Sequence, residues 1–166
     1  RAFKYGPGAF KIDFALSEPV PWKDSECRQA GSLHLGGSMQ EIIHSEKEIW
    51  KGNHAEKPYV LVSQPSIFDD TRAPKGKHTL WTYSHVPNGS TQKLEQEIIN
   101  QIERFAPGFK DIIITKSAIT ASGFQKYNSN YIGGDINGGA QTFKQLFGRP
   151  LLQWDPYKLP ANKLYI

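Results

Sequence analysis

Six amphipathic or titratable side chains alternate with other residues along three short segments of the chain. They are Lys11, Asp13, His34, Trp81, Tyr83 and His85. Successive side chains of a β-strand point to opposite faces of its sheet, so alternation would gather all six on one face. Strands hold side chains rigidly, which favours a well-defined binding site. We therefore predict that this face binds a ligand.

His85 and Lys11 are the candidates for catalysis within this set. An imidazole titrates near neutral pH and can act as a general acid or base. Plainer interpretations stay open. A row of Trp, Tyr and His on a strand is also typical of cross-strand packing with polar tips in water, and a hydrogen-bonded, structural role is open for His85. Lys11 and Asp13 would then form only a surface ion pair, which contributes little.

The segment 130–140 contains two glycine pairs around an acidic residue. Its candidate residues are Gly133, Gly134, Asp135, Asn137, Gly138 and Gly139. Glycine permits a positive φ and a close approach of the backbone to a large partner. The spacing matches neither GxGxxG nor GxxxxGK[ST], so it is not one of those phosphate loops. We favour packing against a ligand or another domain, and a tight surface loop is the alternative.

Cysteine and histidine usage gives little sign of metal or thiol chemistry. The histidines have no spacing typical of a metal site, so we expect no metal, and Asp69–Asp70 is interpreted as the start of a loop. Cys27 is the only cysteine and lies between polar residues, which favours a plain surface thiol over a nucleophile. A single cysteine excludes an internal disulfide and fits a reducing compartment, so we expect a cytoplasmic protein.

Length and composition fit a folded domain. The 166 residues suit one compact unit, and the aromatic content of 12% argues against disorder. The net charge is +4, but the basic residues are spread among acidic ones. A nucleic-acid-binding protein usually clusters its basic residues, so we expect no such partner. No apolar run approaches the roughly 20 residues of a membrane helix, and no secretory signal is visible.

The local patterns predict five strands and two amphipathic helices. The strands are expected at 10–16, 32–35, 59–64, 78–86 and 111–116. The last contains an apolar triplet, which predicts burial on both faces. Ser38 and Glu41 form a capping box before the first helix, which ends at Gly52. Its apolar stripe consists of Met39, Ile42, Ile43, Ile49 and Trp50.

The second helix is the longest, over about 91–105, with Ser90 as its predicted cap. A short helix is expected near 119–126, and 127–163 is expected to be mostly ordered loop, a length often associated with function or with another domain. Together these elements predict an α+β domain with one mixed, largely antiparallel sheet and helices packed on one face. Residues 1–166 would form this single domain.

The ends of the sequence suggest a larger parent. The chain begins at Arg1 without a methionine and stops in the apolar run Leu164–Tyr165–Ile166. Natural termini are usually polar and frayed, whereas this run has the pattern of an interrupted strand. We expect a piece of a longer protein.

Four stretches resemble the phytoene dehydrogenase-related family of FAD-dependent oxidoreductases, in the family's order. They are FKIDFAL at 10–16 with PVPW at 19–22, RAPKGKHTLWTYSHVPNG at 72–89, QIERFAPGF at 101–109 and GGDINGGA at 133–140. The second stretch is the most distinctive for the family. Together the four span nearly the whole chain, and they are specific for the family rather than for a substrate.

The resemblance implies a substrate domain of the flavin amine-oxidase or phytoene-desaturase type, whose sheet roofs a cavity over the flavin ring. A Rossmann-type flavin-binding domain of the same protein would hold FAD and is not included in this chain, which alone would be inactive. A hydrophobic small molecule would give a hydride to the flavin. The implied substrate-binding residues are Asp13, His34, Trp81, Tyr83 and His85. The glycine-rich loop from Gly133 to Gly139 would approach the cofactor or its domain.

Two other functions stay open beside this one. The chain could be a non-catalytic binding or interaction module, or part of a flavin-dependent isomerase. A flavoenzyme requires a flavin-binding unit in the parts of the parent protein that flank this chain, whereas a binding module does not. The flanking sequence would therefore distinguish these two functions. An exposed aromatic sheet face also predicts dimerisation of the isolated chain.

Overall fold

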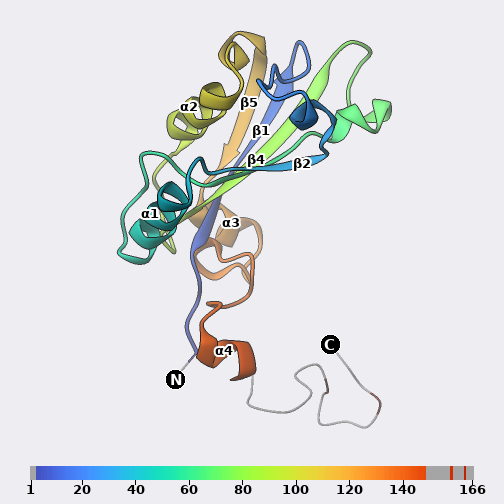
Figure 1. The fold of residues 1–166 in the computed structure, drawn as a ribbon. Coiled ribbons are helices and arrows are strands. Elements are labelled where there is room, and N and C mark those ends of the chain that lie inside the picture. The colour runs from blue at the N-terminus through green and yellow to red at the C-terminus, as the bar shows by residue number, and fades with distance from the viewer. Residues whose placement is uncertain (1–2, 149–157, 159–162, 164–166) are drawn as a thin grey trace.

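The fold is built on a five-stranded sheet. The computed structural model describes residues 3–148, 158 and 163. The strands are β1 (Gly8–Leu16), β2 (Ser32–Leu35), β3 (Val60–Ser63), β4 (His78–Val86) and β5 (Ile113–Ile119). They lie in the order β2-β3-β4-β1-β5, and every pairing among the described strands is antiparallel (Figure 1). The predicted α+β class with a largely antiparallel sheet is confirmed.

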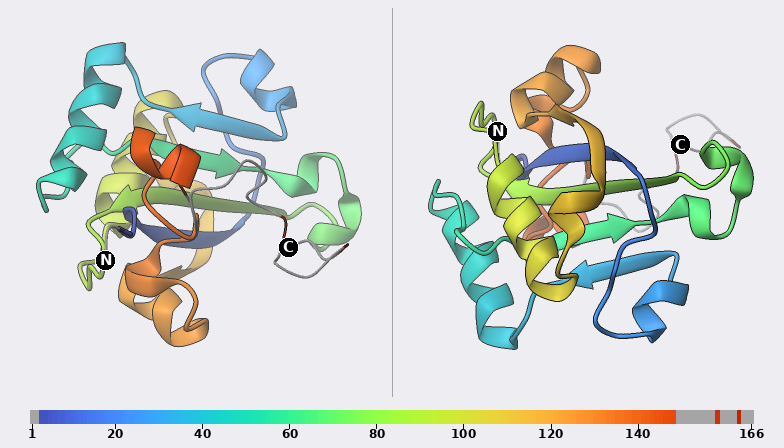
Figure 2. Two further views of the ribbon diagram at one scale, coloured as in Figure 1. Left: turned by 90° about the horizontal axis from the view of Figure 1, so that it is seen from below. Right: turned by 90° about the horizontal axis from the view of Figure 1, so that it is seen from above.

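Four α-helices accompany the sheet in the described residues: α1 (Met39–Trp50), α2 (Glu95–Phe105), α3 (Ala121–Tyr127) and α4 (Phe143–Gly148). Short 3-10 turns lie at Glu26–Gln29, Pro65–Ile67, Asp70–Arg72, Phe109–Ile112 and Ile132–Gly134. Figure 2 shows α2 against one face of the sheet, while α1 lies beside the strands. In the described part of the segment predicted as loop, 127–148, the structure has the 3-10 turn Ile132–Gly134 and the helix α4.

The hydrophobic core lies between the sheet and α2. The inward positions of β1 alternate strictly, with Phe10, Ile12 and Leu16 almost fully buried. They pack in one cluster with Ile98 and Ile102 of α2. Each large aliphatic side chain buried in this way contributes roughly 1.5–3 kcal/mol. The face of the sheet that points away from α2 is therefore supported by this packed core.

The first helix begins where the sequence predicts. The Ser38 hydroxyl accepts a hydrogen bond from the Glu41 amide at 3.3 Å, and the Ser38 amide donates to the Glu41 carboxylate at 2.8 Å. The predicted apolar stripe, however, is only partly buried. Ile49 is buried, whereas Met39 and Trp50 are 66% and 57% exposed. Only Ser45 and Ile49 of α1 are buried, so only a narrow side of the helix meets the core.

Two other predictions are wrong in detail. The second helix begins at Glu95, and Ser90 instead accepts a hydrogen bond from the Gln92 amide and contacts His54. The fifth strand is not buried on both faces, because β5 is an edge strand that pairs only with β1. Ile114 is 54% exposed there. The strand-like run at 164–166 lies outside the described residues.

Candidate functional site: the open face of the sheet

The strand register brings the six predicted residues together on the face opposite α2, here called the open face. One row runs straight across all five strands: His34, Leu61, Tyr83, Lys11 and Ile119. The next row consists of Ser32, Ser63, Trp81, Asp13 and Ser117. His85 lies opposite Ala9 beyond the first row. The open face is therefore aromatic at its centre, along β4, and carries both polar and aliphatic side chains on the strands to either side.

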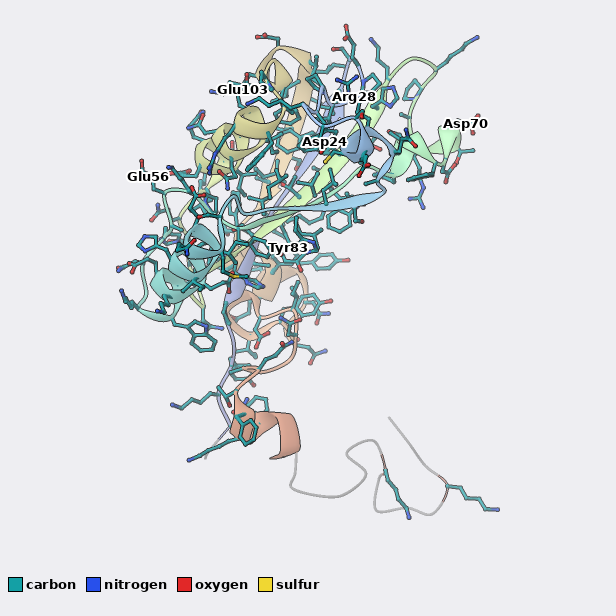
Figure 3. All side chains as sticks on the ribbon, in the orientation of Figure 1. Asp24, Arg28, Glu56, Asp70, Tyr83 and Glu103 are labelled. Carbon is teal, nitrogen blue, oxygen red and sulfur yellow. The ribbon has the colours of Figure 1, made fainter. Side chains whose placement is uncertain are left out.

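The aromatic rings on β4 contact one another. The Trp81 and Tyr83 rings are stacked, with centroids 6.5 Å apart and an interplanar angle of 10°. The Tyr83 and His85 centroids are 6.1 Å apart. Tyr83 lies over the lower half of the sheet in Figure 3. These ring contacts run along one strand, β4, rather than between strands, and they leave a partly exposed aromatic surface.

Lys11 and Asp13 form the ion pair that their spacing suggests. The Lys11 ammonium also lies 5.9 Å from the centroid of the Trp81 ring. An ammonium has donors but no acceptor, and this one is held between a carboxylate and a ring. Lys11 is thus arranged to present positive charge on the open face rather than to accept a proton.

His85 has a partner that the sequence did not reveal. Its Nδ1 lies 3.1 Å from both carboxylate oxygens of Glu46 on α1. Both side chains are about one-third exposed or less, at 28% and 33%. Glu46 belongs to a helix predicted correctly, but no local pattern links it to a strand 39 residues later. Only the placement of α1 beside β4 brings the two groups together.

A small crevice lies beside this pair. It has a volume of about 30 Å³ and is lined by His34, Tyr59, Leu61, Tyr83, Ser84 and His85. The His34 and Tyr59 rings are stacked with centroids 5.4 Å apart. Burial raises the pKa of the Tyr59 hydroxyl, and the nearby Glu46 and Tyr83 raise it further. Tyr59 therefore remains a protonated hydrogen-bond donor at neutral pH.

A larger pocket opens around the edge strand β2. Its volume is about 350 Å³, and its walls are mainly apolar, with Trp22, Leu33, Leu35, Ile42 and Phe105 among them. Asp24, Lys23 and Cys27 also line it, and His34 and Tyr59 border both hollows. Figure 3 shows Asp24 and Arg28 at the upper part of the molecule, away from α1. Cys27 is half-buried and packs against the core, so the prediction of a plain surface thiol is wrong.

The glycine-rich loop is tied to its own chain. The Asp135 carboxylate is fully buried and accepts hydrogen bonds from the amides of Gly6, Asn137 and Gly139 at 2.6–2.8 Å. A side chain on Gly134 would come within 2.6 Å of Ala121. The close backbone approach that the sequence predicts is therefore made, among the described residues, with the start of β1 and with α3.

The six residues of this loop differ in exposure. Gly133, Gly134, Asp135 and Gly139 are buried, while Asn137 and Gly138 are exposed. A side chain on Gly138 would meet no atom within 4 Å. The exposed turn is thus the part of the loop that can approach another molecule, and the buried residues hold it in place.

Neither a metal-binding cluster nor a membrane-spanning helix is found in the part of the chain that the structure describes. Residues 3–148, 158 and 163 contain no group of three His, Cys, Asp or Glu side chains that could hold a metal ion. Asp69 begins a 3-10 turn, accepting from the Thr71 amide at 3.0 Å, which fits its interpretation as a loop start. In the same described residues, no helix has the length and apolar character needed to cross a membrane.

Comparison with known proteins relates the chain to one oxidoreductase-type protein. It is 28% identical over 167 residues to the mouse "Pyridine nucleotide-disulfide oxidoreductase domain-containing protein 2". It is 26% identical over 167 residues to the rat protein of that name. The chain resembles an oxidoreductase-related domain. Each alignment covers 93% of this chain but only 29% of the relative. No family model matches the chain.

These relatives support the expectation of an oxidoreductase-type domain, and they do not support the phytoene dehydrogenase-related family in particular. Their name describes an oxidoreductase domain, and it does not mention phytoene dehydrogenase. The family resemblance is therefore supported only at the level of an oxidoreductase of the FAD or pyridine-nucleotide type. The finer family and its substrate belong to the proposal that follows.

Proposed function

We propose that this chain is the substrate-side domain of a larger FAD-dependent oxidoreductase related to the phytoene dehydrogenases. The open face would form one wall of the site, and the flavin-binding domain would supply the other. The relatives are several times longer than this chain, which covers 29% of each. A second domain of the same protein is therefore available as the partner in the proposal.

The size of the crevice on the open face is the observation that carries this proposal. Sites for small molecules usually have volumes of roughly 300–1,000 Å³, whereas the crevice beside His85 has about 30 Å³. The aromatic and titratable groups thus lie on a face too shallow to enclose a substrate. A second wall would complete the cavity, and a hydrophobic small molecule would suit the Trp81 and Tyr83 rings.

The chain's own residues would then position and orient the substrate. Trp81 and Tyr83 would shape the apolar wall, and His34 and Asp13 would offer polar contacts at its margins. His85 would handle protons, and Lys11 would supply positive charge. When bound, FAD would supply the acceptor for a hydride, which is chemistry that the cofactor carries and the protein only directs.

The glycine-rich loop fits a supporting role toward FAD. The Asp135 carboxylate accepts its hydrogen bonds from backbone amides of this chain. Gly133 lies close to Asn88, and Gly134 lies close to Ala121. The turn at Asn137 and Gly138 is exposed, and a side chain on Gly138 would meet no atom within 4 Å. In this proposal the turn would approach the cofactor or its domain, while the four buried residues keep its shape.

The test uses the full-length protein that contains this chain. We expect its visible absorption spectrum to show bound flavin, and we expect none for residues 1–166 alone. Trp81→Ala with Tyr83→Ala should lower turnover of a hydrophobic substrate while leaving the flavin band unchanged, and Phe68→Ala, which alters a side chain 70% exposed, is the matched control. A full-length protein that stays colourless after FAD is added would refute the proposal. A product with a moved double bond and no reduced flavin would indicate the isomerase instead.

A non-catalytic binding module is the second candidate, because the pocket at β2 has a volume of about 350 Å³ and apolar walls. This volume alone accommodates a small ligand. The apolar dye ANS should then gain fluorescence with residues 1–166, and Leu33→Trp should abolish the gain by filling the pocket. A cytoplasmic location, proposed from the single Cys27, is compatible with either function.

A further inference from the structure

The contact between Glu46 and His85 determines which ring nitrogen carries the proton. Both carboxylate oxygens lie 3.1 Å from Nδ1. An ionised carboxylate can only accept hydrogen bonds, so Nδ1 must be the donor. In the neutral ring the lone pair then lies on Nε2, the nitrogen on the far side from Glu46. Among the described residues, Nε2 has no hydrogen-bond partner.

The surroundings of His85 suit a ligand with a hydroxyl or amino group. The ring borders the crevice together with Tyr59, Tyr83 and His34. A hollow of about 30 Å³ is large enough for one water molecule or one polar group. The Trp81 and Tyr83 rings continue the surface and suit an apolar ring. The Tyr59 and Tyr83 hydroxyls can donate to a ligand, and His85 Nε2 adds an acceptor that has no partner among the described residues.

We propose that His85 Nε2 accepts a proton from a hydroxyl or a protonated amino group on an apolar, ring-bearing ligand, and that Glu46 is the positioning residue. The ligand's O–H or N–H bond breaks, an N–H bond forms at Nε2, and the electron pair stays on the ligand atom. No electron is exchanged in this step. The carboxylate stabilises the imidazolium that results. The ligand is a substrate only if the proposed oxidoreductase function holds. Ligand binding and the tautomer of His85 do not depend on that function.

Lys11 does not fill this role, although both residues lie on the open face. Its ammonium donates to Asp13 and lies against the Trp81 ring. It therefore has no lone pair to offer while it remains charged. The Glu46 contact also adds little to the stability of the fold, because ion pairs between partly exposed groups are weak. Orientation of the ring is the larger effect of Glu46.

The first experiment is ¹⁵N NMR of the histidine rings in residues 1–166. With the ring neutral, we expect the His85 Nδ1 signal in the protonated range and the Nε2 signal in the unprotonated range. Glu46→Gln should mix the two forms, because an amide can accept from or donate to Nδ1. Glu48→Gln is the matched control, since Glu48 lies on the same helix and binds Lys51 and Asn53 instead. A protonated Nε2 in the wild-type chain would overturn the proposal.

The second experiment uses phenol and anisole as probes, which differ in the hydroxyl group. Phenol should shift the His85 Nε2 signal and anisole should not. Glu46→Gln should weaken phenol binding about three- to tenfold, the effect of one hydrogen bond. Equal responses to both probes would refute the inference. Absence of flavin from the full-length protein would refute only the proposed function, because these measurements need no cofactor.

Discussion

At the scale of single residues, the Asp135 carboxylate links two distant parts of the chain. It is fully buried, and its three donors come from Gly6 on one side and from Asn137 and Gly139 on the other. Hydrogen bonds to a charged acceptor are stronger than neutral ones. Nothing in the glycine-rich sequence around Asp135 identifies Gly6 as its partner.

Replacing this carboxylate should therefore destabilise the domain. Asp135→Asn places an amide NH₂ against backbone donors, and we expect a loss of about 1–3 kcal/mol in the free energy of unfolding. Urea denaturation followed by circular dichroism would measure it. Asp70→Asn, at an exposed position, is the control and should change stability by less than about 0.5 kcal/mol. Equal effects of the two substitutions would show that Asp135 is not structurally important.

Two glycines in the same loop offer a matched comparison. Gly134 and Gly138 both have a positive φ, at 81° and 66°. A Cβ on Gly134 would come within 2.5 Å of the Ala121 backbone, whereas a Cβ on Gly138 would meet nothing. Gly138→Ala should cost about 1–2 kcal/mol from backbone strain alone. Gly134→Ala should cost clearly more, and a thermal melt showing equal losses would contradict the packing described here.

The open face shows what local reasoning can and cannot predict. Alternation along β1, β2 and β4 is enough to place Lys11, His34 and Tyr83 on one face, because the period of a strand is two. The Glu46–His85 contact could not be predicted, since it depends on where α1 packs. For the same reason Met39 was predicted to be buried and is exposed.

At the scale of elements, α1 and α2 are joined by an ion pair. Arg104 donates to both carboxylate oxygens of Glu41, at 2.8 and 3.2 Å. The Arg104 hydrogen bond is the largest cause that lowers the pKa of Glu41 from 4.5 to about 2, and the Ser38 amide adds to it. The pair thus links the capping box of one helix to the last turn of the other.

This link predicts a defined pH dependence. Because the folded-state pKa of Glu41 lies below its unfolded value of 4.5, its stabilisation is present above pH 4.5. It is lost as the pH falls from 4.5 toward about 2. Arg104→Gln should lower the melting temperature at pH 6, and the difference from the wild type should shrink through this window. A difference that is constant with pH would show that the pair is not electrostatic.

The strands were predicted better than the helix starts, for a physical reason. Strand boundaries follow side-chain alternation, and β2 and β4 match their expected ranges. The start of α2 depends on whether Ser90 caps the helix or bonds elsewhere, and its hydroxyl contacts His54 at 2.8 Å. That contact is tertiary, so no pattern of neighbouring residues contains it.

At the scale of the whole molecule, the open face leaves an aromatic surface that the described elements do not cover. We expect residues 1–166 to form a dimer at high concentration, because apolar patches favour association. Light scattering should show a mass between monomer and dimer that rises with concentration. Trp81→Ser with Tyr83→Ser should restore the monomer, whereas Phe68→Ser should not. A wild-type monomer at all concentrations would refute this prediction.

The strand order has a consequence for synthesis of the protein. Among the five described strands β1 is made before the others, but it lies between β4 and β5, which are made much later. Until residue 86 has left the ribosome, both edges of a long apolar strand lack their native neighbours. Unpaired strands are prone to associate with other chains. Newly made chains should therefore depend on chaperones until β4 emerges, and truncation before β4 should yield aggregates rather than a smaller folded domain.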